Sequence, residues 1–431
     1  MKILKRKKDI ESFLARLERR GRGADEKVIS QVRRILEAVR RRGDGALLEF
    51  TRRLDGHEEI KPSPKLIAGT AAKADAALRQ ALEFAALRIR SFHERQAKNL
   101  NLKKSWFYGR GDIRLGQVIR PLERVGVYVP GGKAAYPSSV LMNVIPAQVA
   151  GVKEIAVAVP SPGGALNPAV MAALRMLGIR EVYAIGGAQA IGAFAYGTRT
   201  IRRVDKIVGP GNIYVATAKK MVFGAVDIDM IAGPSEILII ADSGARPDFI
   251  AADMLSQAEH DELASSLLVT DSGRIALQVS SEIKKKQLSG LRRVSVAREA
   301  LQKWGAIIVT KDLKTAVEIA NRVAPEHLEI MTRAAETLAR GIKNAGAIFL
   351  GGWSPEPLGD YAAGPSHVLP TGGTARFSSP LGVGDFLKHA SYLKFSKKGF
   401  FEIAGPARVI AQAEGLTAHA RSLEVRQGPQ K

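Results

Sequence analysis

From about residue 118 to residue 350 the chain alternates between short runs rich in Val and Ile and Ala-rich segments of helical length, with Gly and Pro between them. This alternation predicts βαβ units, because neighbouring parallel strands need a long crossover connection that is usually a helix. The predicted strands are 124–129, 154–159, 181–185, 206–208, 236–241, 266–270, 306–310 and 347–350. The predicted helices between them are 139–150, 168–177, 188–196, 213–223, 247–260, 273–286 and 313–323. The sequence therefore predicts an α/β fold with two units and mostly parallel sheets.

Both ends of the chain depart from this pattern. Residues 1–42 predict two short amphipathic helices on either side of 21–23, and residues 71–99 predict one longer helix. Residues 351–385 form a loop rich in Gly and Pro that is too long to be a mere connection. Residues 386–431 form a tail with helical patches.

The first quarter of the chain carries most of the net charge. Residues 1–110 hold 28 Lys and Arg against 14 Asp and Glu, which gives +14 of the formal +23 of the whole chain. A basic patch can bind nucleic acid by releasing counterions from phosphates. Here the basic residues flank apolar positions at helical spacing, such as Val28, Val32 and Ile35, which favours solvated helix faces. Because no nucleic-acid-binding motif is apparent, a basic nucleic-acid-binding protein is the less favoured alternative.

The chain contains no Cys, which excludes disulfides, zinc–thiolate sites, iron–sulfur clusters and thiol nucleophiles. A bound metal would therefore need N and O ligands. The N-terminal residues show no signal-peptide pattern, and the sequence has no run of about 18 apolar residues. Neither export nor a membrane-spanning helix is expected, and the expected location is the cytoplasm.

Two pairs of residues suggest chemistry. Gln257 and His260 are three residues apart and share one face of a predicted helix, an arrangement that suits a metal such as zinc. Glu326 and His327 are adjacent, and the preceding Pro325 is typical of the first turn of a helix. Because His titrates near neutrality and burial can raise the pKa of a Glu toward it, this second pair suits acid–base work. Ordinary surface or core positions are the alternative for both pairs.

The long loop and the tail add further polar candidates. The loop presents Asp360 and His367 among turn-forming residues, and the tail contains Glu414 and His419. Two N and two O ligands with room for a substrate, the catalytic type of zinc site, would come from Gln257, His260, Asp360 and His419. Composition does not show that these side chains meet. Surface positions are expected for the other His residues, which are His57, His93 and His389.

Three Gly-containing turns follow predicted strands, at 126–132, 185–190 and 208–212. Gly in such a turn lets a ligand approach backbone N–H groups where a helix begins. The dinucleotide fingerprint G-x-G-x-x-G is absent, and an ordinary strand-to-helix turn is the alternative for each. Three such turns in one α/β segment are consistent with a ligand at the carboxyl edge of the sheet.

With these motifs in this order, the sequence resembles the histidinol dehydrogenase family over nearly its whole length. The stretches that carry the resemblance are 120–132, 205–212, 232–236, 257–260, 325–327, 359–361, 366–370 and 416–419. The resemblance implies a zinc- and NAD-dependent dehydrogenase that oxidises L-histidinol to L-histidine through an aldehyde, in the last two steps of histidine biosynthesis. It also implies one Zn²⁺ per subunit and a homodimer.

Matching positions imply a role for each candidate residue. Glu326 and His327 correspond to the acid–base pair. The implied zinc ligands are Gln257, His260, Asp360 and His419. The implied substrate contacts are these four ligands together with Ser235, His327, His367 and Glu414. The implied NAD contacts are Tyr128, Gln189 and Asn212. In the family the tail reaches into the neighbouring subunit, so Glu414 and His419 would complete the partner's site.

The residue inventory agrees with this implied chemistry. A chain without Cys cannot oxidise an aldehyde through a thiohemiacetal, so the aldehyde must be hydrated, and Glu326 is placed to activate the water. His327 would take the alcohol proton in the first step and shuttle protons in the second. Zinc would act mainly as a template that holds the amine and imidazole nitrogens of the substrate.

The resemblance also implies two Rossmann-like α/β domains with mostly parallel sheets, a helical N-terminal arm and a C-terminal tail. The expected divisions are 1–21 for the arm, 22–127 with 236–380 for the first domain, 128–235 for the NAD-contacting domain, and 381–431 for the tail. A sibling alternative is a paralogue that oxidises another small alcohol, such as a sulfonated diol. Glu414 argues against it, since a carboxylate suits a cationic amino alcohol. No specific nucleic acid and no membrane are expected as partners.

Overall fold

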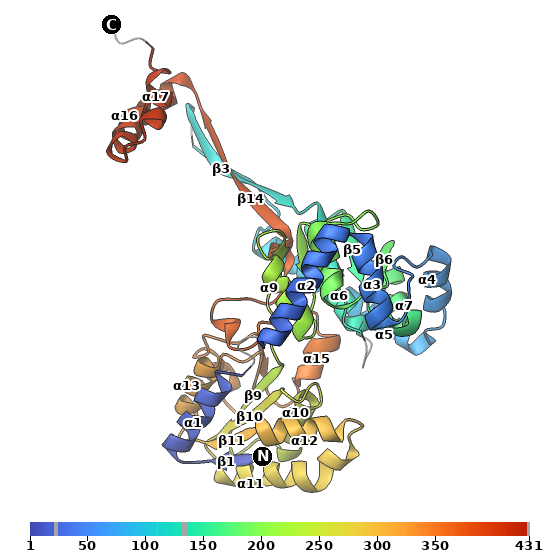
Figure 1. Ribbon diagram of the computed structural model, residues 1–431. Helices are drawn as coiled ribbons and strands as arrows, with labels where there is room; N and C mark the ends of the chain where they lie inside the picture. The colour runs from blue at the N-terminus through green and yellow to red at the C-terminus, as the bar shows by residue number, and fades with distance from the viewer. Residues whose placement is uncertain (21–24, 110, 132–135, 429–431) are drawn as a thin grey trace.

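The computed structural model describes residues 1–20, 25–109, 111–131 and 136–428. Figure 1 shows two α/β units, one above the other, and a long arm that projects from the upper unit and carries the C-terminal helices. The predicted α/β fold with mostly parallel sheets is confirmed. Among the described residues, no helix has the length and apolar character needed to cross a bilayer.

The lower unit contains a six-stranded parallel sheet in the order β1-β11-β10-β9-β12-β13. Its strands are β1 (Lys2–Leu4), β9 (Glu236–Ala241), β10 (Ser265–Thr270), β11 (Ala306–Val309), β12 (His327–Met331) and β13 (Ala347–Leu350). One face is covered by α10 (Pro247–Ala258), α11 (Gly273–Glu282) and α12 (Val294–Lys303). The other face is covered by α1 (Lys7–Leu17) and α13 (Leu313–Val323), beside the short α14 (Ala335–Ala339). Burial on both faces explains the continuous apolar runs of the central strands.

The upper unit contains a five-stranded parallel sheet in the order β6-β5-β4-β7-β8. Its strands are β4 (Arg124–Tyr128), β5 (Glu154–Ala158), β6 (Glu181–Tyr183), β7 (Lys206–Val208) and β8 (Asp227–Ile228). One face packs against α4 (Pro64–Ala71), α5 (Ala76–Asn99), α6 (Pro137–Ala150) and α7 (Pro168–Met176). The other packs against α2 (Glu26–Arg42), α3 (Asp44–Asp55), α8 (Gly187–Tyr196) and α9 (Ile213–Val222). The strand order reverses between β4 and β7, where such sheets bind ligands.

The helices between residues 26 and 99 pack on the five-stranded sheet. The expected division had instead placed residues 22–127 in one domain with residues 236–380, which contain five strands of the six-stranded sheet. Helix α2 shows this directly, since Leu36 and Val39 lie against Gly192 of α8. The division expected between residues 127 and 128 also passes through β4. Helical spacing reveals that a helix has an apolar face, but it does not reveal which of two apolar sheets will cover that face.

The arm is a three-stranded antiparallel sheet in the order β14-β3-β2, followed by two helices. Its elements are β2 (Trp106–Tyr108), β3 (Ile113–Pro121), β14 (Leu387–Phe395), α16 (Lys397–Ala413) and α17 (Thr417–Glu424). Strand β14 pairs with β3 over its whole length, from Leu387 opposite Pro121 to Phe395 opposite Ile113. Only helical patches were predicted in this tail, because β14 is largely exposed and has no regular alternation of apolar and polar residues. Apolar side chains stay exposed along the arm, including Trp106, Tyr108, Leu393, Phe401, Val409 and Ile410.

The three His residues expected at the surface have different environments. His389 is exposed on β14. His93 is fully buried on α5, with Nδ1 3.2 Å from Gln96 Oε1, so the expectation of a surface position was wrong for this residue. His57 is only half-exposed, and its two ring nitrogens have no hydrogen-bond partner among the described residues. Charged neighbours in the sequence were a poor guide, because His93 lies on the buried stripe of α5 together with Leu82, Ala85 and Ile89.

Candidate active site

The carboxyl edge of the five-stranded sheet faces the amino edge of the six-stranded sheet across a cavity of about 170 Å³. From the upper unit the cavity is lined by Gly209–Gly211, which follow β7, and from the lower unit by Ser235, before β9, and Glu326, before β12. His367 of the long loop also lines it. The structure thus gathers Ser235, Glu326 and His367 around one cavity, although they are far apart in the sequence.

Glu326 and His327 stand at the start of a strand, so the helix expected after Pro325 is absent and β12 occupies its place. Helix α13 ends at Val323, and the following Ala324 has a left-handed backbone with φ of 50°. The chain then runs extended and pairs with β9 on one side and β13 on the other. Pro325 marks the end of a helix here rather than the beginning of one.

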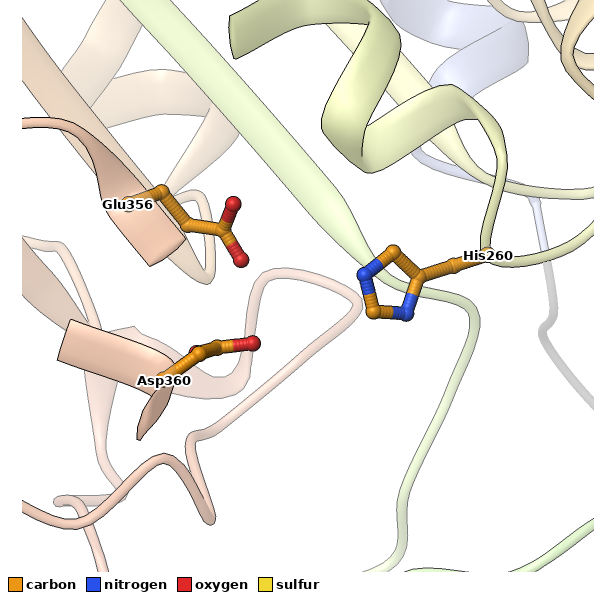
Figure 2. Close-up of side chains that lie close together, drawn as sticks. All are labelled: His260, Glu356 and Asp360. Atoms are coloured by element: carbon orange, nitrogen blue, oxygen red, sulfur yellow. The ribbon is translucent and has the colours of Figure 1, made fainter. Parts of the chain in front are cut away.

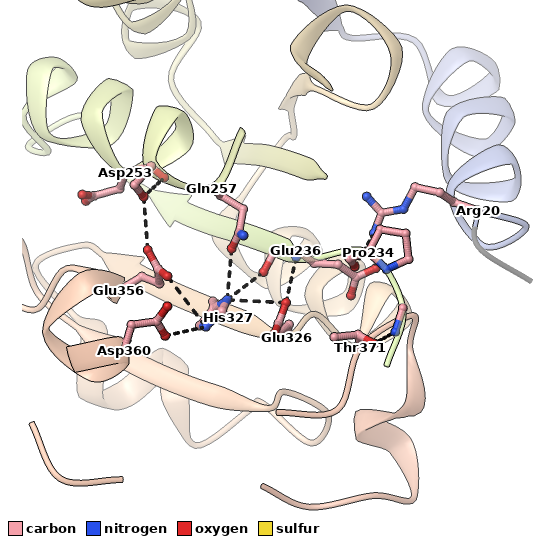
Figure 3. Close-up of polar contacts among 12 residues, drawn as sticks. Arg20, Pro234, Glu236, Asp253, Gln257, Glu326, His327, Glu356, Asp360 and Thr371 are labelled. Atoms are coloured by element: carbon pink, nitrogen blue, oxygen red, sulfur yellow. Dashed lines mark hydrogen bonds and ion pairs between the residues drawn. The ribbon is translucent and has the colours of Figure 1, made fainter. Parts of the chain in front are cut away.

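The main chain of one residue, Glu236, contacts both members of this pair (Figure 3). The N–H of Glu236 donates to Glu326 Oε2 over 3.0 Å. His327 Nδ1 lies 3.1 Å from the carbonyl oxygen of Glu236 and 3.1 Å from Gln257 Oε1. Because both neighbours of Nδ1 are acceptors, this nitrogen carries a proton and donates. Its other nitrogen, Nε2, lies 3.5 Å from Asp360 Oδ1.

The electrostatics of the pair follow from burial and from nearby carboxylates. Burial raises the pKa of Glu326 to about 7, although the charge of His327 and the N–H of Glu236 oppose the shift. Burial alone would lower the pKa of His327, but Glu326, Asp360 and Glu356 outweigh it and raise that pKa to about 10. Both groups are therefore displaced from their ordinary values, as is common for residues that exchange protons in catalysis.

Figure 2 shows a group that could hold a metal ion. It lies beside His327, whose Nε2 is 4.0 Å from Glu356 Oε1 and 3.5 Å from Asp360 Oδ1. One ligand atom from each of His260, Glu356 and Asp360 falls within 4.8 Å of the others. His260 lies just beyond the end of α10, and the other two lie one helical turn apart on α15 (Glu356–Tyr361). An imidazole nitrogen with carboxylate oxygens is a donor set that zinc accepts, so these residues fit such an ion.

Glu356 was missed in the sequence, and of the four expected ligands His260 and Asp360 belong to this cluster. The missed signal was the spacing of four residues between Glu356 and Asp360, which places them on one helix face. Gln257 is 1% exposed and lies one turn before His260, with its Oε1 facing His327. His419 is exposed on α17 of the projecting arm, as is Glu414 at the end of α16, so the chain's own fold does not bring either to the cluster.

Two contacts hold this part of the site in place. Glu329 of β12 accepts a hydrogen bond of 2.8 Å from the N–H of Glu356, which fixes the start of α15. His367 Nδ1 lies 3.0 Å from the carbonyl oxygen of Asp360, which ties the long loop back to the same helix. The loop of residues 351–385 is therefore a structural part of the site, as its length suggested.

The residues expected to contact NAD lie at the carboxyl edge of the five-stranded sheet. Tyr128 ends β4, and its hydroxyl accepts a hydrogen bond of 3.1 Å from the N–H of Gly187 at the start of α8. Gln189 is buried, and its Oε1 has no hydrogen-bond partner among the described residues. Asn212 caps α9 by accepting from the N–H groups of two residues of the first turn. All three border the turns that the sequence marked as ligand-binding candidates.

A buried ion pair fixes one of these turns. Lys219 of α9 pairs with Asp229, and both side chains are almost completely buried. Lys219 Nζ also donates to the carbonyl oxygen of Gly209 over 2.9 Å, while Asp229 Oδ2 accepts from the N–H of Gly209 over 2.7 Å. Gly209 has φ of 110°, and a Cβ there would lie 2.1 Å from the carbonyl oxygen of Tyr128. The turn therefore needs Gly at this position and is held from two sides.

Comparisons with known proteins identify the family. Residues 18–427 match the family model described as histidinol dehydrogenase. A histidinol dehydrogenase of Aquifex aeolicus is 53% identical over 414 residues, which cover 95% of each chain. One of Bacillus subtilis is 53% identical over 401 residues, which cover 92% of each chain. The crystal structure of histidinol dehydrogenase from Elizabethkingia anophelis matches with a TM-score of 0.89 at 37% identity and covers 96% of each chain.

The resemblance noted in the sequence is thereby confirmed over nearly the whole chain. The family model covers β9 with Glu236, β12 with His327 and the preceding Glu326, and the arm with all of α16 and α17. The chain belongs to the histidinol dehydrogenase family, the NAD-dependent oxidoreductases of histidine biosynthesis.

Proposed function

We propose that the chain oxidises L-histidinol to L-histidine in two NAD-dependent steps through histidinaldehyde, using bound zinc. The observation that carries the proposal is the placement of Glu326 and His327. Glu326 lines the cavity and His327 follows it in the chain, and both are buried and held by the main chain of Glu236 beside a cluster that fits a metal ion. Membership of the family supports the same reaction.

His327 and Glu326 would share the proton transfers. His327 is surrounded by Glu326, Asp360 and Glu356, whose carboxylates would stabilise the imidazolium that forms when its neutral ring takes the alcohol proton. Glu326 has Oε2 fixed by the N–H of Glu236 and lies at the wall of the cavity, so it suits the activation of water for aldehyde hydration. No Cys is available for the alternative covalent route.

We assign the zinc to His260, Asp360 and Gln257, with His419 of the partner subunit completing the set. The fit rests on the His260, Glu356 and Asp360 cluster, whose atoms already lie within reach of one ion. Bound zinc would hold the amine and imidazole nitrogens of the substrate as a template. Ser235 and His367, which line the cavity, would contact the substrate from this chain, and Glu414 of the partner subunit would supply a carboxylate for its cationic end.

We assign NAD to the carboxyl edge of the five-stranded sheet, with contacts from Tyr128, Gln189 and Asn212. The unpartnered Oε1 of buried Gln189 and the Gly turns beside Tyr128 support this placement. Bound NAD would supply the hydride acceptor in each step. The turn at Gly209 borders the same cavity as Glu326, so cofactor and acid–base pair can meet there.

Lys219→Met is expected to destabilise the protein and to raise the KM for NAD. The substitution leaves Asp229 buried without its cation, which costs about 3–5 kcal/mol, and it frees the carbonyl of Gly209. Thermal unfolding and steady-state kinetics with varied NAD measure the two effects. Lys220→Met is the matched control, because Lys220 is the exposed neighbour on the same helix. Equal unfolding temperatures for the two variants would contradict the role given to the ion pair.

We further propose a homodimer in which the arm of each subunit reaches the other subunit's site. The arm projects away from both sheets and exposes apolar side chains such as Leu393, Val409 and Ile410, which favours a contact with another protein surface. Glu414 and His419 are exposed on this arm rather than placed at the chain's own cluster. A cytoplasmic location stays a prediction, and binding of nucleic acid stays a hypothesis without support from any comparison.

The test of the function is NADH formation from L-histidinol by zinc-loaded protein. Two NADH per histidinol are expected, with loss of both zinc and activity on chelation and recovery of both when zinc is restored. Circular dichroism before and after chelation provides the control for folding. Folded, zinc-loaded protein that does not turn over histidinol but oxidises another small alcohol would overturn the proposal in favour of a paralogue.

A further inference from the structure

Arg20, at the end of the N-terminal helical segment, is buried beside the catalytic strands (Figure 3). Its Nη2 lies 2.5 Å from Glu236 Oε1 and 3.4 Å from the carbonyl oxygen of Pro234, and its Nη1 donates to the carbonyl oxygen of Leu263 over 2.8 Å. One guanidinium therefore joins the segment before β9, the first residue of β9 and the segment before β10. The side chains of Arg20 and Glu236 are only 1% and 6% exposed.

The segments that Arg20 joins carry the reactive groups. Glu236 is the residue whose N–H binds Glu326 Oε2 and whose carbonyl oxygen binds His327 Nδ1. Leu263 lies three residues after His260, which belongs to the cluster that fits a metal ion. Arg20 thus reaches the acid–base pair through one intervening residue, and the segment that follows His260 through direct contact with its main chain.

We propose that Arg20 is a positioning residue for Glu326 and His327. It fixes the start of β9 by the side chain of Glu236, and the main chain of Glu236 then sets the two reactive side chains. The inference rests on the proposed function and extends the machinery of the reaction to the N-terminal segment, which lies more than 200 residues from the other groups in the sequence. Arg20 itself lines no part of the cavity beside Glu326.

Stabilisation of the fold does not by itself account for the buried contacts of Arg20. A buried ion pair is a poor stabiliser, because desolvation offsets most of its attraction and an apolar pair of similar volume often serves as well. The planar fork of arginine instead gives fixed directions to several acceptors at once. Such outer contacts hold reactive groups in the alignment that proton transfer needs, and their loss commonly costs about 10- to 100-fold in activity.

The test compares three variants of the full-length, zinc-loaded protein. Arg20→Met removes the guanidinium. The double variant Arg20→Met with Glu236→Gln also removes the carboxylate that the first change leaves unpaired. It lacks the same guanidinium and is expected to be more stable than Arg20→Met. Arg19→Met is the matched control, because Arg19 is the exposed neighbour in the same segment. The measurements are kcat and KM for histidinol, zinc content, thermal unfolding, and amide hydrogen exchange of residues 326–331.

In the double variant, kcat is expected to fall about 10- to 100-fold with little change in KM or zinc content. Amide exchange at the start of β12 should be faster than in the control. Arg20→Met should show the same loss of kcat with a lower unfolding temperature. A parental kcat in folded Arg20→Met, or its recovery in the double variant, would overturn the inference. Failure of the parental protein to oxidise histidinol would overturn the proposed function instead. The amide exchange of residues 326–331 would then test the positioning role of Arg20 by itself, and unchanged exchange in the variants would contradict that role.

Discussion

His327→Asn is expected to lower kcat for histidinol oxidation by about 10²- to 10⁴-fold, the range that a positioned acid–base group contributes. The carbonyl oxygen of Glu236 holds Nδ1–H in place on one side of the imidazole, so Nε2 on the other side, 3.5 Å from Asp360 Oδ1, is the nitrogen that can take up and release a proton. Asn offers a single amide and cannot take up a proton. Initial rates of NADH formation at saturating substrate measure the effect.

The control for this variant is His93→Asn. His93 is also a buried His, but it lies on α5 and its Nδ1 contacts only Gln96 Oε1. Its substitution is expected to lower the unfolding temperature and to leave kcat nearly unchanged. Comparable kcat values in the two variants would mean that burial of an imidazole, rather than its place beside Glu326, accounts for the loss.

Mixing two inactive variants is expected to restore activity if the arm crosses between subunits. His327→Asn lacks the base, and His419→Asn lacks a proposed ligand that the chain's own fold leaves exposed on α17. In a mixed dimer one of the two sites would receive an intact residue from each chain. Because half of randomly paired dimers are mixed, an equal mixture should regain about a quarter of the parental activity.

Each variant alone, carried through the same subunit exchange, is the control for this experiment. His389→Asn mixed with His327→Asn provides a second one, because His389 is exposed on β14 of the same arm but carries no proposed role. A mixture of the two inactive variants that stays inactive while mixed dimers form, as shown by native mass spectrometry, would contradict the exchange of arms.

The alternation of Val/Ile runs with Ala-rich segments predicted the parallel strands well, since a strand buried on both faces leaves a clear apolar run. β7, β9 and β13 have the predicted limits. The strands that were missed lack this signal. β1 has three residues in a basic segment, and β14 is largely exposed, with charged residues interrupting it. Local pattern also could not assign α2 to a sheet, because that choice depends on contacts with α8, about 150 residues away.

The site could be predicted only where it depends on local spacing along the chain. Gln257 lies in the last turn of α10 and His260 lies just beyond its end, with the N–H of His260 donating to the carbonyl oxygen of Gln257, so their proximity could be derived from spacing. The contact of Glu236 with Glu326 could not, since it depends on the register of β12 against β9. The strand at Glu326 and His327 was mistaken for a helix start, because Pro325 has the same restricted backbone in either setting. The spacing of four residues between Glu356 and Asp360 could have predicted that Glu356 lies beside Asp360.

In the proposed arrangement the two opposed sheet edges have different tasks: loops after β4, β6 and β7 would contact the cofactor, and the starts of β9 and β12 hold the reacting groups. A substitution in those loops would then change cofactor recognition without altering β9 or β12. The reaction rate then depends on how the five-stranded and six-stranded sheets are aligned, because reacting atoms must approach to about 3–3.5 Å. Residues 229–235 lead directly from β8 to β9. A change of length in this connection would therefore alter turnover while every reacting group stays chemically intact.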